Sequence, residues 1–431
     1  MTRPADPRAL LDQLVREQSG QLVATLTRIL GSSHLDLVHD CVQEALLKAL
    51  RIWSFEGVPE RPAAWLVQVA KHQALDALRH ARMAARKAPE LERSAARTEA
   101  AASTAERSHA TRAESGSDAV DGAPADDVLR LMFLCCHPAL SPESRVALTL
   151  KSVAGFHVAE IARAFLVDEK AIRQRLVRAK RVLRDLAAPF VLPRPRELTT
   201  RLDAVQDVLY LLFTEGYAAT RGDALVRPDL AREAIRLAEL LAARADFATP
   251  RLHALLALMH LQAARLPART DDLGELRRLA EQDRARHDRA ALRRGHFHLA
   301  RAMAGDELSP WHAQAGIAAV HASAQSPAAT DWKQIVWWYD RLLEQHDSPV
   351  AALNRAIAIG HVEGPAAALC ALDALHRELT LRRYALLPAA RGEFLSRLGR
   401  TSDARAEFAR AAKLAANGPQ RRWLERRAAA N

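Results

Sequence analysis

The chain has 431 residues, which is too long for one ordinary hydrophobic core, so its length predicts two to four compact units. Its apolar residues are mostly Ala and Leu, and aromatic residues make up only 5%, a balance that favours helix over strand. The formal net charge of +11 attracts polyanions, of which nucleic acid is the commonest in a cell, although an Arg-rich composition is also typical of a high-GC genome.

The same composition argues against several protein classes. Four cysteines occur without a C-x-x-C spacing, and adjacent Cys135 and Cys136 cannot easily pair with each other. This usage fits a reduced, cytoplasmic setting. The N-terminus leads into no signal-like apolar run, and no stretch approaches the roughly 20 apolar residues of a membrane span, so we expect a soluble protein with no membrane partner.

Residues 8–86 show the periodicity of amphipathic helices. One apolar stripe includes Leu22, Leu26, Ile29 and Leu30, and a second is formed by Leu37, Cys41, Val42, Ala45, Leu46 and Leu50. Gly57-Val58-Pro59 interrupts the pattern, and Pro62 stands where a first-turn proline would. A further helix is then predicted from Ala63 to about Arg86, which completes a domain spanning residues 1–86.

The next segment, residues 87–125, is rich in Ala, Ser, Glu and Arg and has almost no large apolar residue. Such a segment cannot bury enough surface to offset its ordering entropy, so we interpret it as a flexible linker. A second helical domain is predicted over residues 126–190, and a C-terminal helical domain over residues 191–431. The fold class is therefore predicted to be all-α.

Within the C-terminal domain, residues 352–375 and 391–414 can be laid over one another. In each, a small-residue helix reaches Gly360 or Gly399, and a second helix follows with the pattern Ala366-x3-Cys370 or Ala404-x3-Phe408. The pattern is weakly like a tetratricopeptide repeat and predicts stacked helical hairpins. Trp332, Trp337, Trp338 and Tyr339 crowd one helix; we interpret them as packing between hairpins, with a partner or ligand surface as the alternative.

Residues 156–186 carry the sharpest local signal. A short amphipathic helix precedes Asp168, a suitable N-cap, and in the next helix Ile172, Leu176, Ala179, Leu183 and Leu186 fall on one arc. The opposite arc is polar and basic, which is the layout of a helix-turn-helix that offers long donors to phosphates and guanine edges. Its residues are Lys170, Arg173, Gln174, Val177, Arg178, Arg181 and Arg184. The alternative is an ordinary solvated helix face.

A second basic cluster follows Trp65, where the predicted helix carries Lys71, Arg79 and Arg82. Trp53 and Phe55 lie close by in sequence, and aromatic residues beside cations are what single-stranded DNA binds, because bases stack while phosphates pair. The alternative is that the two tryptophans are simply core, which we favour for Trp65.

Taken in order, these motifs resemble extracytoplasmic-function sigma factors of RNA polymerase. Residues 40–49 (DCVQEALLKA) resemble the family's core-polymerase-binding helix, and residues 61–70 (RPAAWLVQVA) its promoter-melting helix. Residues 74–79 (ALDALR) resemble the part that reads the minus-ten element, and residues 159–162 and 172–180 the region that reads the minus-thirty-five element. Residues 133–140, 208–217 and 349–356 resemble a subgroup with a long, tetratricopeptide-like helical extension.

The resemblance implies a role for each motif. RNA polymerase core would be bound through Asp40, Gln43 and Glu44, which fall on the exposed side of their helix. Duplex promoter DNA would be read by Arg173, Gln174, Val177 and Arg178, with Lys170 and Arg181 on phosphates, and melted DNA would meet Lys71, Arg79 and Arg82. A regulatory protein is a further candidate partner, at the C-terminal domain.

No catalytic, metal or cofactor site is predicted, and we expect no enzymatic activity. His137 beside Cys135 and Cys136 fits a core position better than a nucleophile pair, and His253 and His260 lack a carboxylate that would complete a ligand set. Two rival functions remain: a helix-turn-helix regulator that acts without being a polymerase subunit, and a helical-repeat scaffold. The basic, Trp-containing block before the linker argues against both, because neither needs it.

Overall fold

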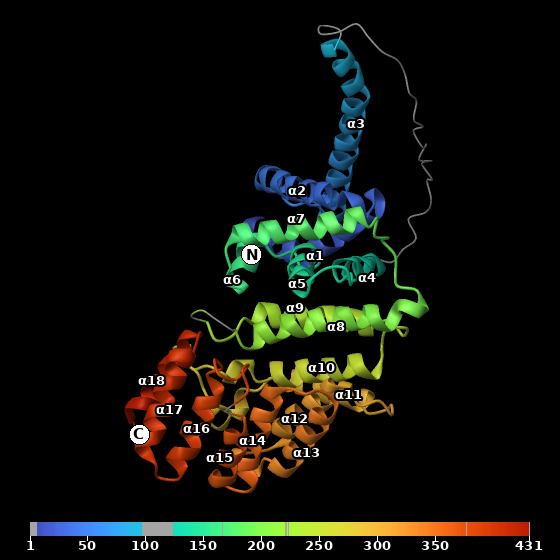
Figure 1. Ribbon diagram of the computed structural model, residues 1–431. Coiled ribbons are helices and arrows are strands. Elements are labelled where there is room, and N and C mark those ends of the chain that lie inside the picture. The colour runs from blue at the N-terminus through green and yellow to red at the C-terminus, as the bar shows by residue number, and fades with distance from the viewer. Residues whose placement is uncertain are drawn as a thin grey trace, which may run out of the picture. The chain divides into compact units, whose positions relative to one another are not determined.

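A computed structural model describes residues 7–96, 124–165, 167–219, 222, 224–375 and 377–430, and within them the side chains of all but residues 7–18, 81, 82, 84–96 and 124. Over these residues the chain is α-helical, as predicted, and its only β-pairing is two isolated bridges (Figure 1). The chain divides into two compact units, the first formed by residues 1–158 and 172–198 and the second by residues 159–171 and 199–431. None of the described helices is both long and apolar enough to cross a bilayer.

The helices of the N-terminal part are α1 (Pro7–Leu30), α2 (Leu35–Glu56), α3 (Pro62–Ala96), α4 (Pro124–Cys135), α5 (Pro142–Ser152), α6 (Val158–Phe165), α7 (Glu169–Asp185) and α8 (Pro195–Tyr217). Those of the C-terminal part are α9 (Pro228–Ala242), α10 (Pro250–Ala263), α11 (Arg289–Ala302), α12 (Pro310–Ser323), α13 (Trp332–Gln345), α14 (Pro349–Val362), α15 (Pro365–Ala374), α16 (Leu386–Arg397), α17 (Thr401–Leu414) and α18 (Gly418–Ala430). Short 3₁₀ helices are η1 (Ser32–His34), η2 (Leu266–Ala268), η3 (Leu279–Glu281), η4 (Arg284–Arg286) and η5 (Pro327–Ala329).

Local sequence explains where many of these helices begin. Ten of the described α-helices begin at a proline, where the missing N–H has no intrahelical partner to lose. Side chains cap others: Ser141 accepts from the backbone N–H of Ser144, and Thr249 from that of Leu252. At the other end of α2, Gly57 adopts φ 83°, which ends the helix at the predicted break, and Pro62 opens α3.

The predicted apolar residues of the first unit are buried or half-buried, with two exceptions. Leu26, Cys41 and Ala45 are buried, as the periodicity predicts. Ile29 is exposed instead, because Val23 and Thr27 lie on the buried side of α1 and place Ile29 on its margin. Leu186, predicted on the apolar arc of α7, is also exposed, because α7 ends at Asp185.

The helix predicted from Ala63 to about Arg86 is longer in the structure. It runs to Ala96 and so extends into the segment interpreted as a linker. Residues 97–123, the rest of that segment up to α4, lie outside the described residues.

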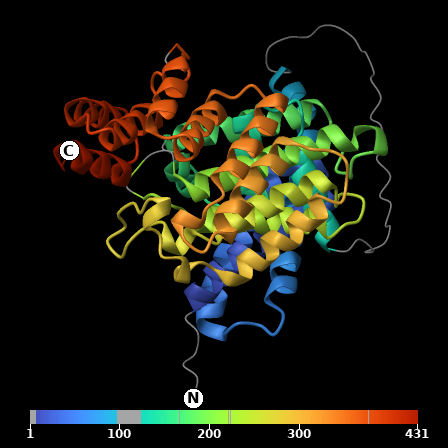
Figure 2. The ribbon, with the colours of Figure 1, turned by 90° about the horizontal axis from the view of Figure 1, so that it is seen from below.

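The second unit is a succession of helices in which each packs on its neighbours in the chain, from α9 to α18. Figures 1 and 2 show these helices side by side, with α16, α17 and α18 stacked at the C-terminal end. One hydrophobic cluster, around Ile335 and Trp338, joins α12, α13 and α14. Another, around Phe394 and Phe408, joins α14 to α18, so the predicted hairpin stacking is present.

The predicted register of the two overlaid hairpins is wrong at Gly360. The turn glycines are Gly364 and Gly399, with φ 97° and 76°, whereas Gly360 lies inside α14. A Cβ on Gly360 would stand 2.4 Å from the ring of Phe394, so this glycine permits close helix packing and does not form a turn. Sequence alone does not distinguish these two uses of glycine.

The two ends of the second unit are joined by Asn417. Its side-chain amide is buried and donates to the carbonyl oxygens of Ala219 and Ala224, both at 3.1 Å, and the N–H of Gly418 donates to the carbonyl of Gly222 at 2.9 Å. These contacts tie the start of α18 to the loop that follows α8.

Candidate nucleic-acid interface

Helix α7 has one buried face and one basic face. Ile172, Leu176, Ala179 and Leu183 are buried, as predicted. The α7 side chains that were predicted to contact DNA are exposed, at Lys170, Arg173, Gln174, Val177, Arg178 and Arg181. Val177 stands among these cations with half of its surface exposed, so the face offers a small apolar contact as well as long donors.

The remaining cations of α7 do not face the same way. The ammonium of Lys180 is largely buried and donates to the carboxylate of Asp36 on α2 at 2.8 Å, and Arg184 lies 3.6 Å from the other oxygen of Asp36. Arg184 was predicted on the free basic face and is instead an ion-pair partner of α2. The exposed basic residues of α7 that have no partner on α2 therefore end at Arg181.

Helix α3 presents a second basic surface. Lys71 and Arg79 are exposed, and Arg79 pairs with Asp76 one turn earlier at 3.3 Å. The third predicted residue, Arg82, lies within α3, but its side chain is outside the described residues.

The aromatic residues beside the α2–α3 loop divide into core and surface. Trp53 is buried, and its ring centroid lies 5.5 Å from that of Trp65, which is half-buried. The core interpretation therefore holds for Trp53, whereas Trp65, for which it was favoured, is only partly buried. Phe55, in the last turn of α2 and two residues before Gly57, is 92% exposed, so its ring faces solvent next to the loop. An exposed ring has its face available for a base to stack on.

The exposed side of α2 is acidic and polar. Asp40, Gln43 and Glu44 are exposed, and Cys41 is buried behind them. Burial raises the pKa of the Cys41 thiol, and the negative charges of Glu44 and Asp40 raise it further. This face suits a basic partner surface.

Buried polar contacts join these helices within the first unit. His39 of α2 and Ser152 of α5 lie 3.0 Å apart through the imidazole Nε2 and the hydroxyl, both in the interior. Burial lowers the pKa of His39 well below its ordinary value, and the charges of Lys180 and Lys151 act in the same direction. Sequence analysis missed this contact because the two residues are far apart in the chain and neither belongs to a motif.

The residues rejected as chemical sites have structural positions. Cys135 and Cys136 are buried in the core, in agreement with the prediction. His260 does have a carboxylate neighbour, because Glu239 lies 3.0 Å from its Nε2. His253 lies 2.9 Å from His298, and these stacked rings pack α10 against α11. Within the described residues no group of three or more His, Cys, Asp or Glu is arranged to hold a metal ion.

Comparisons with known proteins agree with this arrangement of surfaces. Residues 14–83 match the family model of Sigma-70 region 2, and residues 130–183 match that of Sigma-70 region 4. Residues 201–303 match a family of unknown function, DUF6596. An uncharacterized protein of Rhizobium meliloti (strain 1021) is 38% identical over 392 residues, which is 91% of this chain and 89% of the relative. No solved structure matches the chain.

The two matched sigma regions cover the acidic face of α2, the basic surface of α3 and nearly all of α7, in that order. The third match begins in α8, inside the helical segment that the sequence assigned to an extension. The chain therefore belongs to the sigma factors of the extracytoplasmic-function type, in the form that carries a helical C-terminal extension.

Proposed function

We propose that this protein binds RNA polymerase core, recognises promoter DNA and helps to open it. The observation that carries the proposal is the presence of two exposed basic surfaces, on α3 and on α7, with a separate acidic face on α2. A DNA-binding regulator that works without polymerase needs one reading helix and has no use for the other two surfaces.

The acidic face of α2 is the proposed contact with polymerase. Asp40 and Glu44 are one helical turn apart, with Gln43 between them, so their acceptors lie on one stripe. Complementary charge guides encounter and fixes register, while the buried side of α2 remains packed in the first unit.

The surface next to the α2–α3 loop is the proposed contact with melted DNA. Phe55 supplies an exposed ring, and Lys71 and Arg79 supply positive charge along α3. Stacking needs no particular base, whereas the cations hold the backbone, so together they favour a single strand over a closed duplex.

Helix α7 is the proposed reader of the upstream promoter element. Arg173, Gln174 and Arg178 have the donors that pair with guanine or adenine edges in the major groove, and Val177 suits a thymine methyl group. Lys170 and Arg181 are proposed to hold phosphates.

We propose that these functions belong to separate modules, residues 1–86 and residues 126–190, joined by the segment 87–125. Residues 191–431 form the proposed regulatory module, with a protein partner as one candidate regulator. Polymerase core supplies the chemistry of RNA synthesis, so this chain needs only to position and open DNA.

The test is transcription in vitro with bacterial core polymerase and a library of upstream sequences from a high-GC genome. We expect transcripts that require both proteins and that begin downstream of a common pair of elements. Glu44→Arg should abolish transcription and binding to core while leaving binding to duplex DNA intact.

The matched control is Asp347→Arg, which reverses an exposed acidic residue in the second unit and should change neither property. DNA binding without any transcription dependent on core polymerase would contradict the proposal and favour a regulator that is not a polymerase subunit.

A further inference from the structure

Two adjoining cavities lie within the second unit. The first, here named the aromatic cavity, has a volume of about 470 Å³ and is bounded by α13, α14, α16 and α18. The second, the polar cavity, has a volume of about 580 Å³. His321, Tyr339 and Asn354 line both, so the two cavities meet at these residues. Each volume falls within the range of small-molecule sites in proteins.

Flat rings form one wall of the aromatic cavity. Trp332 stacks on His361 with 3.8 Å between ring centroids and an interplanar angle of 4°. The ring of His321 meets the Trp332 ring edge-on at 5.4 Å. Leu386, Phe394 and Trp423 contribute further apolar surface, so the cavity suits a flat or chain-like apolar group.

Polar groups at the junction of the cavities have no protein partner. Among the described residues, the hydroxyl of Tyr339 and the amide of Asn354 make no hydrogen bond, and the Nδ1 of His321 is buried and unbonded. Burial raises the pKa of Tyr339 to about 12, so its hydroxyl keeps its proton at neutral pH and can donate a hydrogen bond. Burial, with the charges of Arg265 and Arg284, lowers the pKa of His321 to about 4, so that ring is neutral.

Two arginines beside this junction lack a carboxylate partner. Arg284 lines the aromatic cavity and donates to the backbone carbonyl of His321 at 2.9 Å. Arg265 lines the polar cavity and donates to the side-chain oxygen of Gln282 at 3.1 Å. Neither forms an ion pair within the described part of the chain, and the Nε of Arg284 is buried without a partner. A guanidinium withdrawn from water without a counter-charge is costly, so an anionic ligand would be favoured here.

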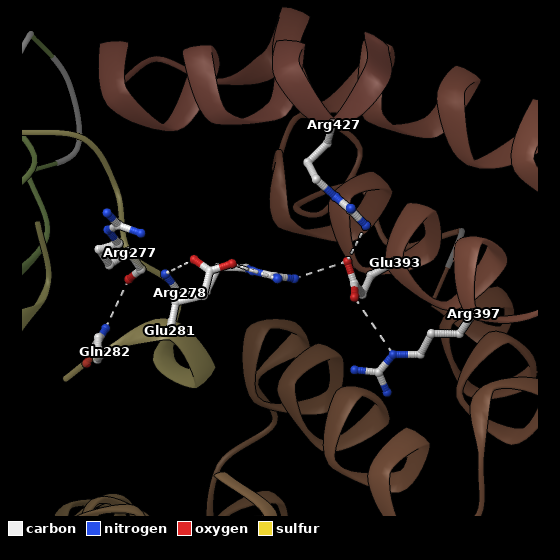
Figure 3. Close-up of polar contacts among 7 residues, drawn as sticks. All are labelled: Arg277, Arg278, Glu281, Gln282, Glu393, Arg397 and Arg427. Atoms are coloured by element: carbon white, nitrogen blue, oxygen red, sulfur yellow. Dashed lines mark hydrogen bonds and ion pairs between the residues drawn. The ribbon is translucent and has the colours of Figure 1, made fainter. Parts of the chain in front are cut away.

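Glu393 is the one acidic side chain among the described residues that line the aromatic cavity, and it is already neutralised. Figure 3 shows the guanidinium groups of Arg278, Arg397 and Arg427 directed at its carboxylate. The distances are 3.3 Å to Arg278, 3.8 Å to Arg397 and 2.9 Å to Arg427. The aromatic cavity therefore keeps a net positive charge.

We infer that these cavities bind a small organic anion with a flat or acyl apolar body. The anionic group lies at the junction, where Arg284 supplies charge and Tyr339 and Asn354 supply donors. The apolar body lies along the Trp332 ring in the aromatic cavity. The site goes beyond the proposed promoter function, and it makes the extension a sensor domain for a small molecule.

The experiment uses the full chain and two fluorescent probes of similar shape. 1-Anilinonaphthalene-8-sulfonate has an aromatic body and a negative charge, and N-phenyl-1-naphthylamine has the body without the charge. We expect saturable binding of the anion at one site per chain, with weaker binding of the neutral probe. Bound anion should also raise the melting temperature of the protein, because it binds the folded state only.

Three variants test the geometry. Arg284→Gln should weaken binding of the anionic probe roughly tenfold or more, because one charge-assisted contact is lost. The affinity for the neutral probe should stay unchanged. Tyr339→Phe removes a hydroxyl that bonds to no described residue, so it should preserve stability and weaken anion binding by roughly threefold to tenfold. Trp332→Ala should lower the affinity for both probes, because both have the apolar body that lies along the Trp332 ring. The matched control is Arg286→Gln, an arginine in the same 3₁₀ helix that lines neither cavity.

Equal anion affinity in the wild-type protein and in Tyr339→Phe would overturn the inference, and this variant decides the matter even if Arg284→Gln unfolds the domain. Equal affinity for the charged and the neutral probe would also overturn it, because the junction would then provide no recognition of charge. Neither result bears on transcription with core polymerase, so the proposed function is tested separately.

Discussion

Asp127 of α4 is 2% exposed, and its carboxylate accepts a hydrogen bond at 2.9 Å from Arg28 of α1, 99 residues earlier in the chain. A second arginine, Arg130, binds the other oxygen at 2.7 Å. This contact lies between the segment that matches sigma region 2 and the helix that leads into region 4. The first unit is thus held together by a buried carboxylate as well as by apolar packing.

Asp127→Ala is expected to lower the free energy of unfolding of the first unit by about 2–3 kcal/mol. The substitution removes the carboxylate that pairs with Arg28 and Arg130 and leaves both guanidinium groups without it. The value is set below that of a fully buried pair, since the Arg28 side chain is 29% exposed. Urea unfolding measures it. Asp76→Ala, which removes an exposed pair, is the control and should cost less than about 0.5 kcal/mol. An equal loss of unfolding free energy in both variants would show that the buried Asp127 contact contributes no more to stability than an exposed ion pair.

Trp53 and Phe55 should separate stability from promoter opening. Trp53→Ala removes a ring that is 2% exposed, and it should destabilise the protein by about 3–5 kcal/mol. Phe55→Ala should change stability by less than about 0.5 kcal/mol, yet cost about 1–3 kcal/mol in open-complex formation through the lost stacking. Fluorescence of a base analogue in the minus-ten element reports the opening. An unchanged open complex in Phe55→Ala would remove this residue from the proposed DNA surface.

Substitutions on α7 should distinguish base reading from phosphate contact. Arg173→Ala is expected to weaken promoter binding by about 1–3 kcal/mol and to relax the preference at one base pair. Lys170→Ala is expected to weaken binding to all DNA sequences alike. It should also reduce the slope of the logarithm of the binding constant against the logarithm of the salt concentration by about one. Arg383→Ala, an exposed arginine of the second unit, is the control. A uniform loss in Arg173→Ala would make Arg173 a phosphate contact.

The second unit should lose stability in mild acid. Burial lowers the pKa of His260 to about 4, and burial with the neighbouring histidines lowers that of His298 to about 4, against an ordinary value of 6.5. As the pH falls below 6.5 the unfolded chain takes up protons before the folded protein does, so stability declines until the pH reaches about 4. The slope is at most about 1.4 kcal/mol per pH unit for each histidine.

This decline is measured by urea unfolding between about pH 7 and pH 5. The double variant with His260→Gln and His298→Gln should be less stable at neutral pH and should show a shallower pH dependence. His296→Gln, an exposed histidine on the same helix as His298, should leave the dependence unchanged. If stability depends on pH as steeply in the double variant as in the wild-type protein, the titrating groups are residues other than His260 and His298.

Sequence by itself determined the helical class, the division of α7 into an apolar and a basic face, and the exposure of Asp40, Gln43 and Glu44. These are local properties, because a 3.6-residue period and a proline or glycine at a helix end act over a few residues. The resemblance to sigma factors rests on the same short segments, which is why it was visible without a structure.

Only the tertiary structure decided which distant groups meet. Asp127 and Arg28, or Tyr339 and His321, are brought together by helix packing, and no periodicity encodes that pairing. The same reason explains why Gly360 was misread as a turn: its missing Cβ is required by Phe394, a residue of another helix. The local sequence pattern determines which side chains lie on each face of a helix. Which of these side chains become buried, and which charged groups remain without an ion-pair partner, is decided only when the faces of separate helices pack together.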